Sequence, residues 1–210
     1  MNLVESLNWR YATKKFDSSK TVDSDVFTRI MESTNLTATS LGLQAYNIIV
    51  VTNSELKNKL VEASYGQTKV AEASHFVIFA ARTDINENYI EKYVNYAGEI
   101  RKMPSQEIEG FKQMVGGFIN HLDEDAKINW ASKQCYIALG TLLTACATEK
   151  VDSCPMEGFV ADKFDEILGL KAKNLKSVVA AAVGFRSNED FTQNFKKIRK
   201  PLSEMVIEFK

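Results

Sequence analysis

Cysteine, histidine and net charge are all scarce in this sequence. Its 210 residues include three cysteines and two histidines, and the formal net charge is −1. Three cysteines without a CxxC pair make a poor disulfide framework and a poor zinc site, which favours a reducing, cytoplasmic location. A nearly neutral chain has no overall field that would attract nucleic acid or an anionic membrane. Any anion site must therefore be built from locally placed cations.

Several common kinds of site are absent as well. His75 and His121 have no further ligand at metal-binding spacing, so no metal site is expected. No apolar run approaches the roughly 20 residues of a membrane helix. The absence of G-x-S-x-G, a Walker loop and G-x-G-x-x-G argues against serine hydrolases, P-loop NTPases and Rossmann dehydrogenases.

What is present is the composition of a soluble globular protein, with 45% hydrophobic and 25% charged residues. Without repeats or linkers, residues 1–210 are expected to form one α+β domain. Apolar patterning predicts strands at 47–52, 75–81 and 177–185. It also predicts helices at 2–9, 55–63, 128–150 and 161–168, and a further helix that begins at residue 24. Residues 85–122 are expected to be helical with breaks near Pro104 and at Gly116–Gly117. Residues 152–159 read as a turn, and the tail as extended around Pro201.

Two segments predict a homodimer. The helix expected at 128–150 has little polar surface, and the apolar tail "MVIEF" (205–209) has no evident partner within a small sheet. A dimer that buries this helix and exchanges the tail would cover both.

Cations cluster near both ends of the chain. In "NWRYATKKFD" (8–17), Arg10 and Lys14 share a face in either a helix or a strand. Lys197 and Arg199 do the same in an extended tail. The two pairs could converge on one phosphate, or each could be solvated surface, and charge alone favours the second.

Two further features have an ordinary interpretation and a functional one. In "CPMEGF" (154–159), the backbone N–H groups of Glu157 and Gly158 could point outward as donors to a cofactor, or the segment could be a simple turn. Gln134, expected on the buried helix, needs a hydrogen-bond partner, which could be a backbone carbonyl or a cofactor hydroxyl.

Taken in order, seven stretches resemble the FMN-dependent nitroreductase family, in particular its oxygen-insensitive NAD(P)H nitroreductase and dihydropteridine reductase branch. They are "RYATKKFD" (10–17), "TSLGLQAY" (39–46), "ASHFVIFAA" (73–81), "WASKQCYIALG" (130–140), "CPMEGF" (154–159), "VVAAAVGFRSNED" (178–190) and "KKIRKP" (196–201). The resemblance implies a nitroreductase-like fold with a central, mainly antiparallel sheet flanked by helices. It also implies an intertwined homodimer with one tightly bound FMN at each of two interface sites.

The resemblance also assigns roles by position. Arg10, Lys197 and Arg199 match the phosphate-binding cations, within a cofactor segment that includes Tyr11, Ala12 and Thr13. Lys14 matches a lysine at the flavin N1/C2 edge. Gln67, or its neighbour Gly66, matches the pyrimidine-edge residue, and Lys69 a further flavin and nicotinamide contact. Glu157 and Gly158 match the loop near flavin N5. Thr39, Ser40 and Gln134 match residues that reach the cofactor across the dimer, and Leu41, Arg101 and Phe118 match nicotinamide or substrate contacts.

The chain departs from the family at Ala12, where a serine usually touches the flavin, and in "SLGLQAY" and "MVGGF". One lost hydrogen bond costs about 1 kcal/mol, so FMN binding should survive. The implied activity is two-electron, ping-pong transfer of hydride from NAD(P)H through flavin N5 to a nitroaromatic, quinone or pterin, with no essential acid or base. Alternatives are a flavin storage or sensing protein of the same fold, and a flavin-free structural dimer.

Overall fold

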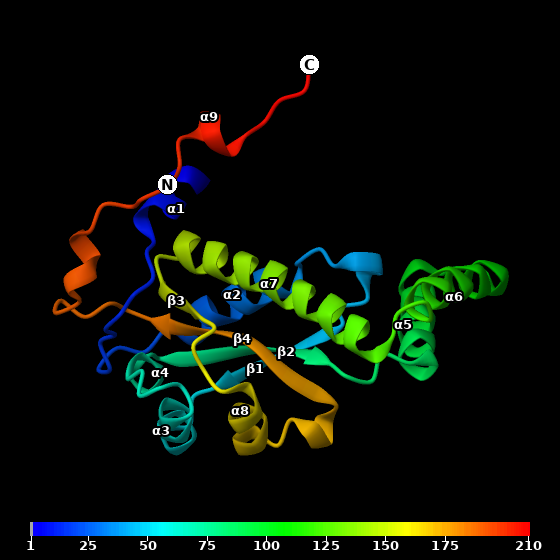
Figure 1. Cartoon of the computed structure of the whole chain (residues 1–210), viewed down its shortest axis with the longest axis horizontal. Helices are drawn as coiled ribbons and strands as arrows, with labels where there is room; N and C mark the ends of the chain where they lie inside the picture. Colours follow the sequence, from blue (N-terminus) through cyan, green and yellow to red (C-terminus); the bar gives the residue numbers. More distant parts are fainter. Residues whose placement is uncertain (1) are drawn as a thin grey trace.

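A four-stranded antiparallel sheet lies at the centre of the computed structural model, which describes residues 2–210. The strands are β1 (Tyr46–Val51), β2 (His75–Arg82), β3 (Asp152–Met156) and β4 (Leu175–Gly184), in the order β1-β2-β4-β3. The strands expected at 47–52, 75–81 and 177–185 are confirmed as β1, β2 and β4 to within two residues. Figure 1 shows helices on both faces of this sheet.

Side chains alternate between the two faces of the sheet, so two cores form. On one face, Val77, Phe79 and Ala181 belong to a core that α2 (Ser24–Asn35) and α7 (Glu124–Thr148) share, and to which α5 (Glu87–Arg101) and α6 (Ser105–Ile119) also contribute buried residues. On the other, Phe76 and Ala182 pack against α3 (Ser54–Glu62), α4 (Lys69–Glu72) and α8 (Ala161–Leu168). This is the period of two that a sheet covered on both faces requires.

The prediction of a turn at 152–159 is wrong, because residues 152–156 form the strand β3. Pro155 was the misleading residue, since proline usually marks a turn. Here it lies on an edge strand, opposite Ala181 of β4, where a missing N–H is tolerated. Only residues 157–160 connect β3 to α8.

The expected break at Gly116–Gly117 is also wrong, whereas the break near Pro104 is confirmed. Helix α6 runs through both glycines, and Pro104 stands at its N-cap. Each glycine costs a helix roughly 1 kcal/mol, which the packing of Val115 and Ile119 into the core offsets.

Helix α7 is longer than expected and is buried on one side only. It begins at Glu124, where the Asp123 side chain accepts from the Ala126 N–H. Cys135, Ala138 and Leu142 face the core, while Ile137 is 49% exposed. Within one chain, part of the apolar surface of α7, at Tyr136 and Ile137, is therefore left exposed.

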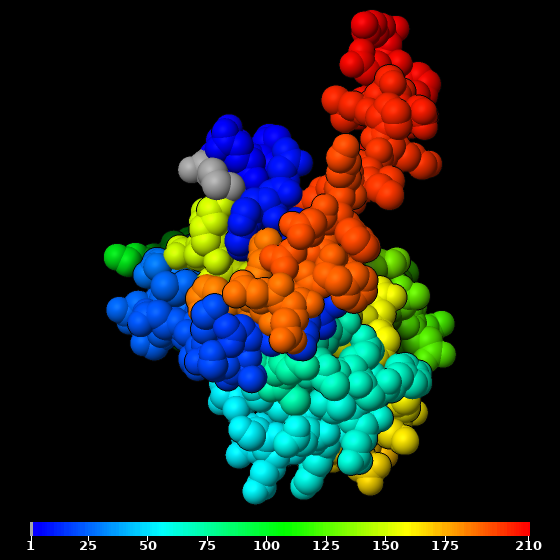
Figure 2. Space-filling view, turned by 90° about the vertical axis from the view of Figure 1, so that its left-hand side faces the viewer, coloured from blue at the N-terminus to red at the C-terminus, as the bar shows by residue number. Residues whose placement is uncertain are grey.

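Both ends of the chain lie on one side of the molecule. Helix α1 (Leu3–Trp9) sits beside the start of the tail, and the tail then projects away from the body (Figures 1 and 2). Pro201 is extended, as expected, but a single helical turn, α9 (Leu202–Met205), follows it. Residues 201–210 are all exposed, including Phe209 at 96%.

Three short 3-10 turns complete the chain: η1 (Ser40–Gly42), η2 (Lys171–Lys173) and η3 (Phe191–Asn194). Among residues 2–210, none of the helices is both long and apolar enough to cross a membrane.

Candidate functional site

Three cations from opposite ends of the chain meet beside α1. The Lys197 Nζ donates to the carbonyl oxygens of Leu7 and Arg10. Burial and then the charge of Arg199 lower the pKa of Arg10, and burial and then the charge of Arg10 lower the pKa of Lys197. The Arg10 Nε is buried without a hydrogen-bond partner in the described chain. These cations crowd one another, and a bound anion would relieve the repulsion.

The segment that follows Arg10 is held by one buried carboxylate. Asp190 accepts from the N–H groups of Lys14 and Lys15 at 2.7 and 3.2 Å and from the Tyr11 hydroxyl at 3.0 Å. It also accepts from the N–H and hydroxyl of Thr192. Burial alone would raise the pKa of Asp190, but these hydrogen bonds outweigh it and lower that pKa to about 2.

The same segment lies along β3. Ala12 bridges Ser153 in parallel, which buries Thr13 and leaves the Lys14 side chain exposed. The aromatic rings on either side of Arg10 contact a protein cation: the Arg186 guanidinium lies 4.5 Å from the Trp9 ring and 4.6 Å from the Tyr11 ring.

Gln67 and Gly158 also come together. The Gln67 Nε2 donates to the carbonyls of Gly158 at 2.6 Å and Ser64 at 3.0 Å, which leaves its Oε1 as a free acceptor. Gly66, which has φ +72°, turns the chain just before it. Lys69, at the start of α4, is 9% exposed, and its ammonium has no acceptor among the described residues.

A second set of predicted residues surrounds η1. The Gln134 Oε1 accepts from the Ser40 N–H at 2.9 Å, and its Nε2 donates to the Trp130 carbonyl at 3.3 Å. Of the two interpretations of Gln134, its hydrogen bonds within this chain fit the backbone-partner one, although one amide hydrogen stays available. Thr39 closes the turn by accepting from the Gln44 N–H at 3.2 Å.

The remaining predicted residues lie in η1 itself or on the helix pair α5 and α6. Leu41 has φ 57°, and its carbonyl accepts from the Tyr93 hydroxyl of α5 at 2.9 Å. Phe118 of α6 is 43% exposed, with its ring 5.9 Å from that of Trp130. Arg101 ends α5 and is exposed. Figure 1 shows η1 and the α5–α6 pair near the opposite end of the sheet from α4.

The structure therefore divides the predicted residues into two sets within one chain. The first, which we call the phosphate-side set, comprises Arg10, Tyr11, Ala12, Thr13, Lys14, Gln67, Lys69, Glu157, Gly158, Lys197 and Arg199. The second, the η1 set, comprises Thr39, Ser40, Leu41, Arg101, Phe118 and Gln134. Among residues 2–210, no hydrogen bond joins a residue of one set to a residue of the other, and Tyr136 of α7, which belongs to neither set, contacts Glu157.

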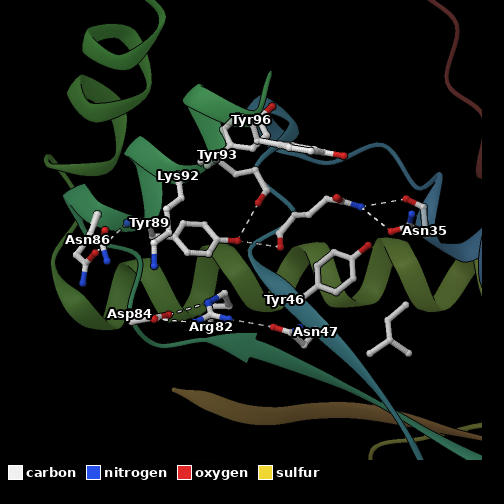
Figure 3. A pocket seen from close by; sticks show the side chains of 14 residues that line it. Asn35, Tyr46, Asn47, Arg82, Asp84, Asn86, Tyr89, Lys92, Tyr93 and Tyr96 are labelled. Atoms are coloured by element: carbon white, nitrogen blue, oxygen red, sulfur yellow. Dashed lines mark hydrogen bonds and ion pairs between the residues drawn. The ribbon is translucent and has the colours of Figure 1, made fainter. Parts of the chain in front are cut away.

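A cavity of about 640 Å³ lies between the chain just after η1 and helix α5. None of the predicted site residues lines it. Figure 3 shows the Tyr89 hydroxyl reaching the backbone of the η1 loop, where it donates to the carbonyls of Leu43 and Gln44 at 3.0 and 3.2 Å. Since Gln44 has φ 43°, these contacts hold the loop in a strained conformation.

Sequence reasoning missed two residues that organise the site. Asp190 lies within the quoted stretch "SNED", but its contacts with residues 176 and 175 positions away leave no local pattern. Tyr136, two residues after Gln134, donates to the Glu157 carboxylate at 2.6 Å. Among residues 2–210, no group of three or more histidine, cysteine or carboxylate side chains could hold a metal ion.

An antiparallel sheet between helices, with the tail beside α1, is the nitroreductase fold. A nitroreductase-like protein of Bacillus subtilis, ydfN, has this fold with a TM-score of 0.88 and 21% identity over 98% of each chain. A structure of a nitroreductase-like protein from Exiguobacterium sibiricum in complex with FMN matches with a TM-score of 0.86 and 17% identity, over 100% of this chain and 98% of that one.

The chain belongs to the nitroreductase family, whose model matches residues 7–185. In sequence it is 40% identical over 176 residues to YfkO of Bacillus subtilis (strain 168), which is named as a candidate NAD(P)H nitroreductase. That match covers 79% of this chain and 78% of YfkO.

Proposed function

We propose that this protein is an FMN-dependent NAD(P)H oxidoreductase, active as a homodimer in the cytoplasm, that reduces nitroaromatics, quinones or pterins. The observation that carries the proposal is the phosphate-side cation group, Arg10, Lys197 and Arg199, with the orphaned Arg10 Nε. Two guanidinium groups and an ammonium suit the dianionic phosphate of FMN.

The other residues of the phosphate-side set fit a flavin ring. Glu157 and Gly158 are exposed residues, and their N–H groups have no acceptor among the described residues. The Gln67 Oε1 has no donor among the described residues and could accept from the flavin N3–H, and Lys69, a largely buried side chain, offers an ammonium without an acceptor in the described chain. Lys14, on the exposed face of its segment, would place a cation near the N1/C2 edge.

Each residue then has a physical task. FMN, when bound, accepts and returns a hydride at N5, so the protein need only bind, orient and polarise. Arg10, Lys197 and Arg199 would hold the phosphate, and Asp190 fixes the backbone that carries Lys14. The η1 set, with Gln134 and Ser40 already joined, would come from the partner subunit and cover the cofactor.

The direct test is an absorbance spectrum of the purified protein, followed by anaerobic NADH or NADPH. We expect flavin bands near roughly 450 nm that bleach on reduction. Bound flavin that fails to bleach would instead support storage or sensing, and a protein that takes up no FMN would refute the cofactor assignment. Arg10→Met should weaken FMN binding by about tenfold or more, because it removes a charge-assisted contact. The matched control, Lys59→Met on the exposed side of α3, should bind FMN normally.

Lys14→Ala gives a sharper prediction about electrostatics. Removing a cation near the reduced, anionic flavin should raise the free energy of that reduced form, relative to the oxidised form, by about 2 kcal/mol at an effective dielectric constant of about 20. FMN should stay bound, with a lower reduction potential and turnover slowed about tenfold. Redox titration of the bound flavin checks this, and an unchanged potential would contradict the role of Lys14.

A further inference from the structure

The connection between β3 and α8 is a tight turn in which the Glu157 and Gly158 carbonyls accept hydrogen bonds, while the N–H groups of the same two residues have no acceptor in the described chain. The Glu157 carbonyl accepts from the Phe159 N–H at 2.8 Å, and the Gly158 carbonyl accepts from Gln67 at 2.6 Å. The N–H groups of Glu157 and Gly158 have no acceptor in the described chain. Since both residues are exposed, the turn presents two donors to whatever lies in front of it.

Two side chains from different elements hold this turn from either side. Gln67 reaches it from the loop before α4, and a Cβ added to Gly158 would lie 3.1 Å from the Gln67 Nε2. From α7, the Tyr136 hydroxyl donates to the Glu157 Oε1 at 2.6 Å, the length of a charge-assisted O–H···O⁻ bond. Glu157 is 21 residues from Tyr136, so this bond joins the turn to the longest helix.

The Tyr136 hydroxyl stays protonated and therefore remains a hydrogen-bond donor. Burial, then the hydrogen bond to Glu157, raises its pKa to about 12, so it keeps its proton across the physiological range. Without this donor, the carboxylate of an exposed glutamate would be free to swing toward the two adjacent N–H groups. It would then compete for them and place a negative charge where electrons must arrive.

We propose that Tyr136 is a positioning residue: it anchors the Glu157 side chain on α7 and so keeps the Glu157 and Gly158 N–H groups aimed at the flavin. This inference rests on the proposed FMN function. The inference gives a role to Tyr136 of α7, which belongs to neither the phosphate-side set nor the η1 set.

The first arm of the test uses the FMN-free protein. In Tyr136→Phe, which removes one oxygen and keeps the ring, the Phe159 amide should exchange its hydrogen about tenfold faster than in the wild type. Tyr96→Phe, at an exposed tyrosine of α5, is the matched control and should exchange as the wild type does. Unchanged exchange in Tyr136→Phe would overturn the proposal. This arm stands even if the protein proves not to bind FMN.

The second arm uses the FMN-loaded protein. Tyr136→Phe should lower kcat about tenfold with KM for NAD(P)H within twofold, and should shift the reduction potential of the flavin. The Tyr136→Phe/Glu157→Gln double variant should be no slower than Tyr136→Phe alone, because the bond between these two side chains is already lost. Tyr96→Phe, the control of the first arm, should keep kcat within twofold of the wild type. If the double variant is about tenfold slower than Tyr136→Phe, Glu157 does not act through Tyr136, and the proposal fails.

Discussion

At the scale of single residues, Asp190 holds the N-terminal segment. Its carboxylate is fully buried and accepts from three backbone N–H groups, those of Lys14, Lys15 and Thr192, and from the hydroxyls of Tyr11 and Thr192. A buried acceptor with this many donors is costly to remove, because each donor loses its partner without gaining water. Asp190 therefore governs both local stability and the position of Lys14.

Asp190→Asn tests this through pH. The folded pKa of about 2 lies below the unfolded value of roughly 3.9, so the carboxylate stabilises the fold above about pH 4, by about 2.6 kcal/mol, and loses that effect as the pH falls toward 2. The variant should be less stable by that amount at pH 7, with a flatter acid limb in urea denaturation. Glu62→Gln, at an exposed position of α3, should stay within about 0.5 kcal/mol of the wild type. A wild-type pH dependence in Asp190→Asn would contradict this account.

The cysteines should be unreactive in the folded protein. All three are buried, and burial raises the pKa of Cys135 and of Cys146 to about 12. Since the thiolate is the nucleophile, a thiol reagent at pH 8 should label no cysteine in the native protein over minutes and three after unfolding in guanidinium. Rapid labelling of the native protein would show that the core around α7 opens.

At the scale of elements, uninterrupted apolar segments were predictable, whereas segments interrupted by proline or glycine were not. Strands β2 and β4 are apolar on both faces, and such a run is hard to place anywhere but in a covered sheet. Strand β3 has only five residues, and its Pro155 reads locally as a turn. In α6, local propensity at Gly116 and Gly117 predicted a break that tertiary packing overrides.

Two glycines give a matched pair of predictions. A Cβ on Gly184, at the end of β4, would lie 3.0 Å from the Ser74 backbone nitrogen and 3.1 Å from the Phe16 ring, whereas one on Gly117 of α6 meets nothing within 4 Å. Gly184→Ala should lower the free energy of unfolding by about 1–3 kcal/mol through overpacking. Gly117→Ala should raise it by up to about 1 kcal/mol through helix propensity. Chemical denaturation of both variants is the measurement, and equal stabilities would refute the packing argument.

At the scale of the whole molecule, the single chain leaves large apolar groups uncovered. The tail exposes Ile207 at 79% and Phe209 at 96%, and α7 exposes Tyr136 and Ile137 on its outer side. The two sets of predicted site residues also share no hydrogen bond within the described chain. A homodimer that exchanges tails would resolve all three features, and it stays a prediction.

A truncated chain that ends at Pro201 tests that prediction while keeping Lys197 and Arg199. We expect the full chain to sediment as a dimer at micromolar concentration and the truncated chain to dissociate at least tenfold more readily, because it loses the apolar tail. A stable full-length monomer would refute the dimer. Equal dimer stability in the two chains would refute tail exchange alone.

The sequence predicted the residues expected to touch the cofactor but not the residues that hold them in place. Resemblance supplied Arg10 and Lys197, which the structure places together although they are 187 residues apart. It did not supply Asp190 or Tyr136, which act on backbone and on another side chain, so neither belongs to a motif that names a ligand contact. Such supporting residues become visible only when the fold brings distant segments together.

The strand order also fixes when the sheet can be completed as the chain leaves the ribosome. Strand β1 can pair with β2 early, but β2 and β3 each need β4, which ends at residue 184 of 210. Until then, one edge of β2 is open and β3 has no strand partner, so more than four-fifths of the protein must be synthesised before its centre closes. Long-range pairing of this kind slows folding and exposes apolar strands to aggregation. The nascent chain should therefore depend on chaperones most strongly just before β4 emerges.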